Sequence, residues 1–177
     1  EVEIIYVRKG PLTIEIDGQQ FTGDDGSVYI VSPGVLHMMS APETPVDYFT
    51  FLFPLEFISF QAKDDLEDEV FFPLRNHTRG FRPEITNRNL LEKLVPILDE
   101  LAEANGKMGT HRHIQVRIRL LQMVDLLVEY DQLEEKTRSS SGELEKEILM
   151  YIQDNYHEHI GLAGLSDQFH LSAKYMS

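Results

Sequence analysis

Short runs of alternating apolar and polar residues, each closed by a turn signal, fill the first third of the chain. Residues 12–16 (Leu-Thr-Ile-Glu-Ile) show the two-residue period of a half-buried strand. Asp17-Gly18 follows directly, and this dipeptide is typical of a tight hairpin turn. Residues 28–31 are apolar throughout and stop at Ser32-Pro33-Gly34. Strands this short, with turns about every eight to twelve residues, predict a β-sandwich or barrel.

The last strand of this region divides its side chains between two faces. Over residues 46–53, Tyr48 and Thr50 alternate with three phenylalanines. Successive side chains of a strand point to opposite faces, so the phenylalanines share one face and the two hydroxyl-bearing residues share the other.

Two helices are expected in the middle of the chain. Residues 89–92 (Asn-Leu-Leu-Glu) fit a helix N-terminal capping box, and leucines at 91, 94, 98 and 101 follow with helical spacing. Pro96 predicts a kink or a later start of this first helix. Thr110 is expected to cap a second helix that runs to about Lys136.

The second helix carries more apolar surface than docking on one core requires. One stripe consists of Ile114, Ile118, Leu121, Val124 and Val128, and another of Val116, Leu120, Met123, Leu127 and Tyr130. Two interpretations stay open. The helix either lies between two layers of its own domain or meets a second subunit.

The composition of the chain excludes several classes of functional site and argues against others. The chain has no cysteine, which excludes disulfide frameworks, thiolate catalysis and cysteine-ligated zinc. Its net charge of −14 argues against nucleic-acid binding by most of the chain, because phosphate contacts need Lys and Arg. No apolar run approaches the roughly 18–20 residues that span a bilayer, so a cytoplasmic protein without membrane contact is expected.

Residues 143–177 are expected to form a helix, a turn, a short helix and the start of a third helix. Apolar residues recur at helical spacing in the first two segments: Leu144, Ile148, Ile152 and Tyr156, then Leu162, Leu165 and Phe169. Ser172 can cap the third segment. This pattern fits a helix-turn-helix that reads DNA, or a plain helical hairpin. Residues 137–142 (Thr-Arg-Ser-Ser-Ser-Gly) are expected to be a linker.

Residues 148–177 resemble the first helix-turn-helix of the AraC-type transcription regulators. The matching residues are Ile152, Asn155, Tyr156, Ile160, Gly161, Leu162, Leu165, Phe169, Leu171, Ser172, Tyr175, Met176 and Ser177. Ser166 departs from the alanine usual in the family but is also small. The resemblance implies that Ser172, Ala173 and Lys174 open the DNA-reading helix.

The first part of the chain resembles the cupin barrel that these regulators use as a sensor. The carrying residues are Gly10, the Asp17-Gly18 hairpin, and residues 26–37, which run from a glycine through a strand to Pro33-Gly34 and then His37. The two resemblances occur in the order that the family uses. They imply a sensor that dimerises through paired helices and presents DNA-binding modules to two half-sites.

The resemblance also implies an effector pocket in the barrel, with the three phenylalanines of residues 49–53 packed against the helices behind it. The candidate ligand-binding residues are Tyr6, Arg8, His37, Met39, Tyr48 and Thr50. The strand register near Arg8 is open by one residue. His37 has two interpretations: a hydrogen bond to a backbone carbonyl at the turn, or contact with a polar effector.

Metal chemistry is not expected. Cupin enzymes usually hold a metal with a His-x-His and a Glu in their first motif and a further His in the second. The matching part of this chain keeps only His37. We therefore expect no metal and no cofactor.

We predict an α+β fold with a cupin-like barrel over residues 1–54, helices over about 89–136, a linker over 137–142 and a partial helix-turn-helix over 143–177. Residues 1–136 would bind effector and dimerise. The predicted function is a ligand-responsive DNA-binding regulator, not an enzyme, whose partners are DNA, a small effector such as a sugar, and a second copy. Two alternatives stay open: a cupin enzyme acting on a sugar or small acid, and a dimerisation module that senses nothing.

Overall fold

The structure, a computed structural model, describes residues 1–41, 45–60, 64–103 and 109–136, then 148, 151–152, 155, 157 and 160–169. The chain divides into two compact units, Glu1–Lys136 and Thr137–Ser177.

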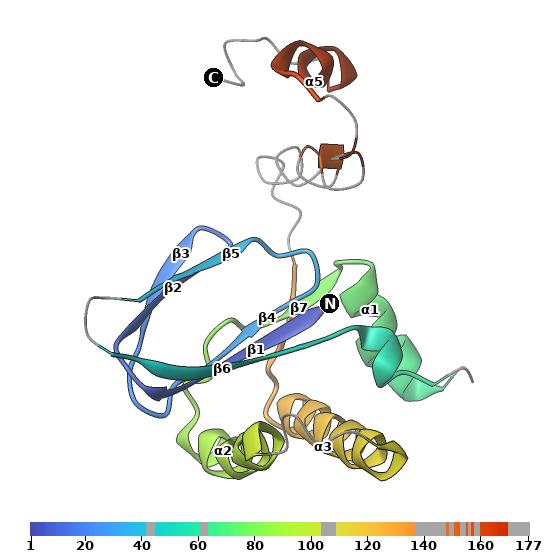
Figure 1. Cartoon of the computed structure of the whole chain (residues 1–177). Helices are drawn as coiled ribbons and strands as arrows, with labels where there is room; N and C mark the ends of the chain where they lie inside the picture. The colour runs from blue at the N-terminus through green and yellow to red at the C-terminus, as the bar shows by residue number, and fades with distance from the viewer. Residues whose placement is uncertain are drawn as a thin grey trace. The chain divides into compact units, whose positions relative to one another are not determined.

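Two antiparallel three-stranded sheets face each other in the first unit (Figure 1). Sheet A has the strand order β4-β1-β6, made from β1 (Val2–Lys9), β4 (Val28–Val31) and β6 (Asp47–Phe53). Sheet B has the order β3-β2-β5, made from β2 (Leu12–Ile16), β3 (Gln19–Gly23) and β5 (His37–Ser40). These six strands pair as two separate sheets and not as one closed barrel.

The predicted hairpin between β2 and β3 is confirmed. Asp17 (φ 53°) and Gly18 (φ 76°) both have positive φ, the conformation that a two-residue type I′ turn requires. The strands pair from Leu12 with Gly23 to Ile16 with Gln19. The alternation in β2 therefore does bury its aliphatic side chains on one face.

Aliphatic side chains and one tyrosine fill the space between the two sheets. This inner cluster consists of Ile5, Val7, Leu12, Ile14, Ile16, Tyr29 and Val31, each at most 3% exposed. Because these residues are removed from water, they give the two sheets a common core. Each Å² of apolar surface that they bury stabilises the fold by about 25 cal/mol.

The outer face of sheet A packs against two helices, α2 (Arg88–Glu103) and α3 (Thr110–Glu129), which lie on the side away from sheet B (Figure 1). Leu90, Leu94 and Leu98 of α2 are buried there, together with Leu120, Met123 and Leu127 of α3. The predicted leucine stripe is confirmed at Leu94, Leu98 and Leu101, but it begins at Leu90, because Leu91 is only partly buried.

The helix ends differ from the sequence prediction in three ways. Asn87, not Asn89, caps α2, because its Oδ1 accepts the Leu90 N–H at 3.2 Å. The helix continues through Pro96, so the later start was wrong. Gly109, not Thr110, occupies the N-cap position of α3.

The second helix is also shorter than the predicted run to Lys136. α3 stops at Glu129, Asp131 takes a positive φ of 51°, and Leu133–Glu135 forms strand β8. β8 pairs with β7 (Arg79–Phe81), which the sequence pattern did not indicate. Pairing with β7, about fifty residues earlier in the chain, therefore explains why residues 133–135 form a strand and do not continue α3.

Residues 55–75 connect sheet A to β7 through short helical turns. They comprise the 3₁₀ turn η1 (Leu55–Phe57), the π-helical η2 (Glu67–Phe71) and α1 (Phe72–Arg75). Leu55, Ile58, Phe71 and Leu74 are buried in the cluster between sheet A and the helices.

The second unit contains helix α5 (Leu162–Gln168), which covers most of the second short helix expected from the spacing. The Tyr151 and Phe169 rings meet edge to face at 5.5 Å, and Asn155 Nδ2 donates to the Tyr151 carbonyl at 2.8 Å. Leu165 is buried, whereas Leu162 is 57% exposed. The predicted linker (137–142) and the DNA-reading residues Ser172, Ala173 and Lys174 lie outside the described residues.

Candidate functional site

A histidine–carboxylate contact connects the two sheets. His37 opens β5 and pairs with Ile16, and Glu3 lies in β1 between Val31 and Leu52. The His37 Nε2 is 2.8 Å from Glu3 Oε2, and the His37 Nδ1 is 3.3 Å from the Val35 carbonyl oxygen. Both partners are acceptors, so a doubly protonated imidazole satisfies both contacts.

Neither side chain of this pair is fully buried. The His37 side chain is 28% exposed and that of Glu3 is 12% exposed. A polar molecule can therefore reach the imidazole from solvent and compete with the carboxylate. Sequence reasoning overlooked Glu3, although a charged residue in the apolar run Val2-Glu3-Ile4-Ile5 was a usable signal.

Four of the six candidate ligand-binding residues lie on the facing sides of the two sheets. Tyr48 pairs with Val7 and Thr50 with Ile5, so both point toward sheet B like the inner-cluster residues opposite them. Met39 pairs with Ile14 and packs against the same cluster, and His37 lies two residues before it. Tyr48 is 39% exposed, so this inner side opens to solvent along β6.

The predicted facing of the β6 phenylalanines is confirmed. Phe53 is buried, and Phe49 and Phe51 are partly buried against the cluster between sheet A and the helices.

Tyr6 and Arg8 lie on the other side of sheet A from these four. Tyr6 is 5% exposed and belongs to the cluster beneath the helices. Burial, followed by the nearby Asp99 carboxylate of α2, raises the pKa of the Tyr6 phenol. Arg8 lies 5.3 Å from the Phe49 ring centre, and its Nε is 3.5 Å from Asp99 Oδ1, an ion pair and not a hydrogen bond.

A β-bulge explains why the register near Arg8 was open. The pairing of β1 with β6 shifts between Val7 and Lys9, so Arg8 is the extra residue. Because Tyr6 and Arg8 face the helices, the structure does not bring them together with His37.

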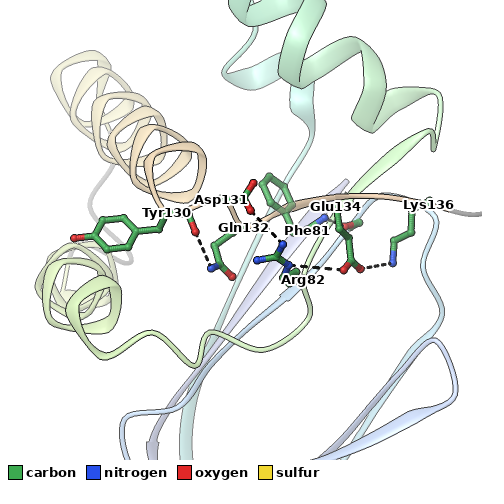
Figure 2. Close-up of polar contacts among 8 residues, drawn as sticks. Phe81, Arg82, Tyr130, Asp131, Gln132, Glu134 and Lys136 are labelled. Atoms are coloured by element: carbon green, nitrogen blue, oxygen red, sulfur yellow. Dashed lines mark hydrogen bonds and ion pairs between the residues drawn. The ribbon is translucent and has the colours of Figure 1, made fainter.

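The first unit ends in a polar network around β7 and β8 (Figure 2). Arg82 is 3.3 Å from the Asp131 carboxylate and 3.9 Å from that of Glu134, and Lys136 Nζ donates to Glu134 at 3.3 Å. The buried Gln132 donates through Nε2 to the Tyr130 carbonyl at 3.2 Å. These contacts hold the chain between α3 and residue 136 against β7.

The same network reaches the turn that precedes His37. The Phe81 N–H of β7 donates to the buried Ser32 Oγ at 2.7 Å. Ser32 begins the Ser-Pro-Gly turn, and a Cβ added to Gly34 of that turn would lie 2.8 Å from the His77 ring. This turn therefore lies close to His77, in the segment leading to β7.

The helix stripe predicted for dimerisation divides between core and surface. Val124 is 5% exposed and packs in the core. Ile114, Ile118 and Val128 are 53%, 48% and 44% exposed, and Leu121 is partly buried. Three large aliphatic side chains of one helix therefore face solvent.

No group of three or more His, Cys, Asp or Glu side chains gathers as a metal site within the described ranges. None of the helices in that part of the chain is long and apolar enough to cross a membrane.

Residues 1–152 match the family model of the AraC-like ligand binding domain. The chain belongs to this family. The expected cupin-like α+β fold is thereby confirmed for the described first unit, as facing antiparallel sheets backed by helices.

A solved structure is similar as well: the crystal structure of the AraC-like transcriptional activator CuxR, with a TM-score of 0.50 and 14% sequence identity. The similarity covers 98% of this chain but 58% of the CuxR chain. At this identity it supports the fold alone. The search of curated proteins gave no match.

Proposed function

We propose that this chain is the effector-sensing and dimerisation part of a ligand-responsive, DNA-binding transcription regulator without catalytic activity. The observation that carries the proposal is membership of the AraC-like ligand binding domains over residues 1–152. We keep the domain boundaries predicted from the sequence: a sensor over 1–136, a linker over 137–142 and a partial helix-turn-helix over 143–177. Such a protein would work in the cytoplasm.

The effector site that we propose lies at the solvent-exposed edge of the two sheets, at His37, Met39, Tyr48 and Thr50, next to the apolar cluster that fills the space between them. A hydroxyl-rich effector such as a sugar suits this site, because imidazole, phenol and hydroxyl groups all exchange hydrogen bonds with alcohols. Binding would place effector oxygens where Glu3 now contacts His37.

The response would pass from this site to the end of the first unit. Displacing His37 moves the turn that begins at Ser32, whose Oγ accepts from Phe81. β7 then carries the change to β8, the last strand before the linker. Coupling of this kind requires that the effector bind two arrangements with different affinities.

The second copy would meet the exposed side of α3 at Ile114, Ile118, Leu121 and Val128. Apolar side chains that gather on one exposed helix face mark an interface more often than an ordinary surface. Two copies would present two DNA-binding modules to repeated half-sites.

The test is a gel shift of the full-length protein on DNA upstream of its own gene, with and without pools of sugars and small acids. A shift that changes with one pool, and no longer changes in a His37→Gln variant, supports the proposal. DNA binding that no metabolite alters, or none at all, would contradict it. Stoichiometric metal in the purified protein would favour a cupin enzyme instead.

A further inference from the structure

A groove outside the space between the sheets runs along β6, between this strand and the ends of two helices. Its volume is about 450 Å³, within the range of roughly 300–1,000 Å³ found for small-molecule sites. β6 and η1 form one wall, and the end of α2 and the first half of α3 form the other. Thr50 and His113 are exposed at its rim.

The groove is lined mainly by aromatic and aliphatic side chains. Phe49 and Phe51 stack with ring centres 6.3 Å apart and an interplanar angle of 24°. Phe57, Leu101 and Val116 extend this apolar lining toward the helices. Such walls favour a ligand with an apolar body.

Among the described residues that line the groove, Arg112 is the one permanently charged side chain. No described residue forms an ion pair with Arg112, and the lining residues that the structure describes include no carboxylate. Arg112 also lines a second pocket, together with Glu100 and Glu103. Glu100 already forms an ion pair with Arg119, at 2.5 Å. The net charge of −14 repels anions from the chain as a whole, so any preference of this groove for an anion has to come from the local guanidinium of Arg112.

The position of Arg112 in the first turn of α3 adds to this preference. The N–H groups of a helix N-terminus have no partner within the helix, and the helix dipole is positive there. A guanidinium next to them matches the two oxygens of a carboxylate.

We propose that this groove binds a small amphipathic carboxylate, with its apolar body along Phe49, Phe51 and Phe57 and its carboxylate at Arg112. This site is distinct from the proposed effector site at His37, and it does not depend on the chain's being a regulator. Thr50 borders both sites, but its side chain points toward sheet B and belongs to the proposed effector site.

The experiment is isothermal titration of the 177-residue chain with octanoate and with octanamide, its uncharged isostere. Octanoate is expected to bind at least about tenfold more tightly than octanamide, the ratio that corresponds to about 1.4 kcal/mol of charge-assisted bonding. Arg112→Gln should reduce octanoate affinity to that of octanamide and leave octanamide affinity unchanged. Arg88→Gln, at a highly exposed position on α2, is the matched control for a lost charge and should alter neither.

Two further readouts keep the test decisive if binding is weak. Phe57→Leu, which trims the apolar wall, should weaken both ligands alike, and its melting temperature shows that the variant is folded. Equal affinity of both ligands, or an unchanged preference in Arg112→Gln, would overturn the proposal. Two results together would also overturn the proposal: octanoate does not bind, and Arg112→Gln shifts the monomer–dimer equilibrium in sedimentation. The groove would then be covered by a second copy.

Discussion

The imidazole of His37 on sheet B contacts the carboxylate of Glu3 on sheet A, at 2.8 Å between Nε2 and Oε2. Below the pair the space between the sheets is filled by aliphatic side chains. This contact is therefore a polar bridge at the edge of an apolar core, and it connects two sheets that share no strand pairing among the described residues.

We predict a measurable coupling between His37 and Glu3. Replacing each by glutamine, singly and together, should give a coupling of about 1 kcal/mol in the free energy of unfolding, because the pair is only partly exposed. Urea unfolding of the four proteins measures it. The exposed pair Arg88–Glu92 is the control and should give a coupling near zero. Additive effects at His37 and Glu3 would show that the contact does not join the sheets.

Ser32→Ala should destabilise the first unit by about 1–3 kcal/mol, because the buried Phe81 N–H loses its acceptor. Ser40→Ala, at an exposed position of β5, removes the same hydroxyl as a control and should change the free energy of unfolding little. Denaturant unfolding gives both values. Hydrogen exchange of the Phe81 amide should also become faster in Ser32→Ala alone.

The stability of the chain should fall above about pH 10 through Tyr29. Burial, followed by the Glu84 carboxylate, raises the pKa of the Tyr29 phenol from 10.0 to about 12. The unfolded phenol ionises first, so stability present below pH 10 is lost as the pH rises toward 12, by up to about 2.7 kcal/mol. Urea unfolding at pH 8 and pH 11 should show a smaller decrease for Tyr29→Phe than for the unaltered chain. An equal decrease would assign the effect to other tyrosines.

Ile118→Glu should weaken self-association at least about tenfold, because it places a charge in the middle of the exposed apolar side of α3. Leu36→Glu makes the same kind of change at another exposed position, 47% accessible and away from α3, and should leave association unchanged. Sedimentation velocity over a concentration series measures both. If the two variants associate equally well, the dimer does not use α3.

Local patterns predicted the β2–β3 hairpin, β4 and β6, and the facing of the β6 side chains. Alternation and turn chemistry act over a few residues, so Asp17-Gly18 and the phenylalanines of β6 could be interpreted from sequence alone. The helix start at Asn87 could not, because Asn89 fits the same capping chemistry two residues later.

Features that depend on distant partners were missed. The apolar spacing of α3 continues to Leu133, yet the chain leaves the helix because β8 pairs with β7 and the buried Gln132 fixes the bend between them. Glu3 looked like an ordinary polar position of a strand, since only the fold brings sheet B and His37 opposite it. Four of the candidate effector residues do share the inner side of the sheets, but Tyr6 alternates with the inward-facing Ile5 and Val7 and so faces the helices, and Arg8 lies beside Asp99 of α2.

The position of β6 at an edge of sheet A also bears on the solubility of the domain. Residues 48–53 (Tyr-Phe-Thr-Phe-Leu-Phe) carry no charge, and such segments readily add to the same segment of another molecule to form aggregates. Asp47 at the start of the strand and Pro54 just after its end oppose this, the first by repulsion and the second by lacking an N–H. A ligand or subunit that covers β6 should therefore also protect the domain from aggregation.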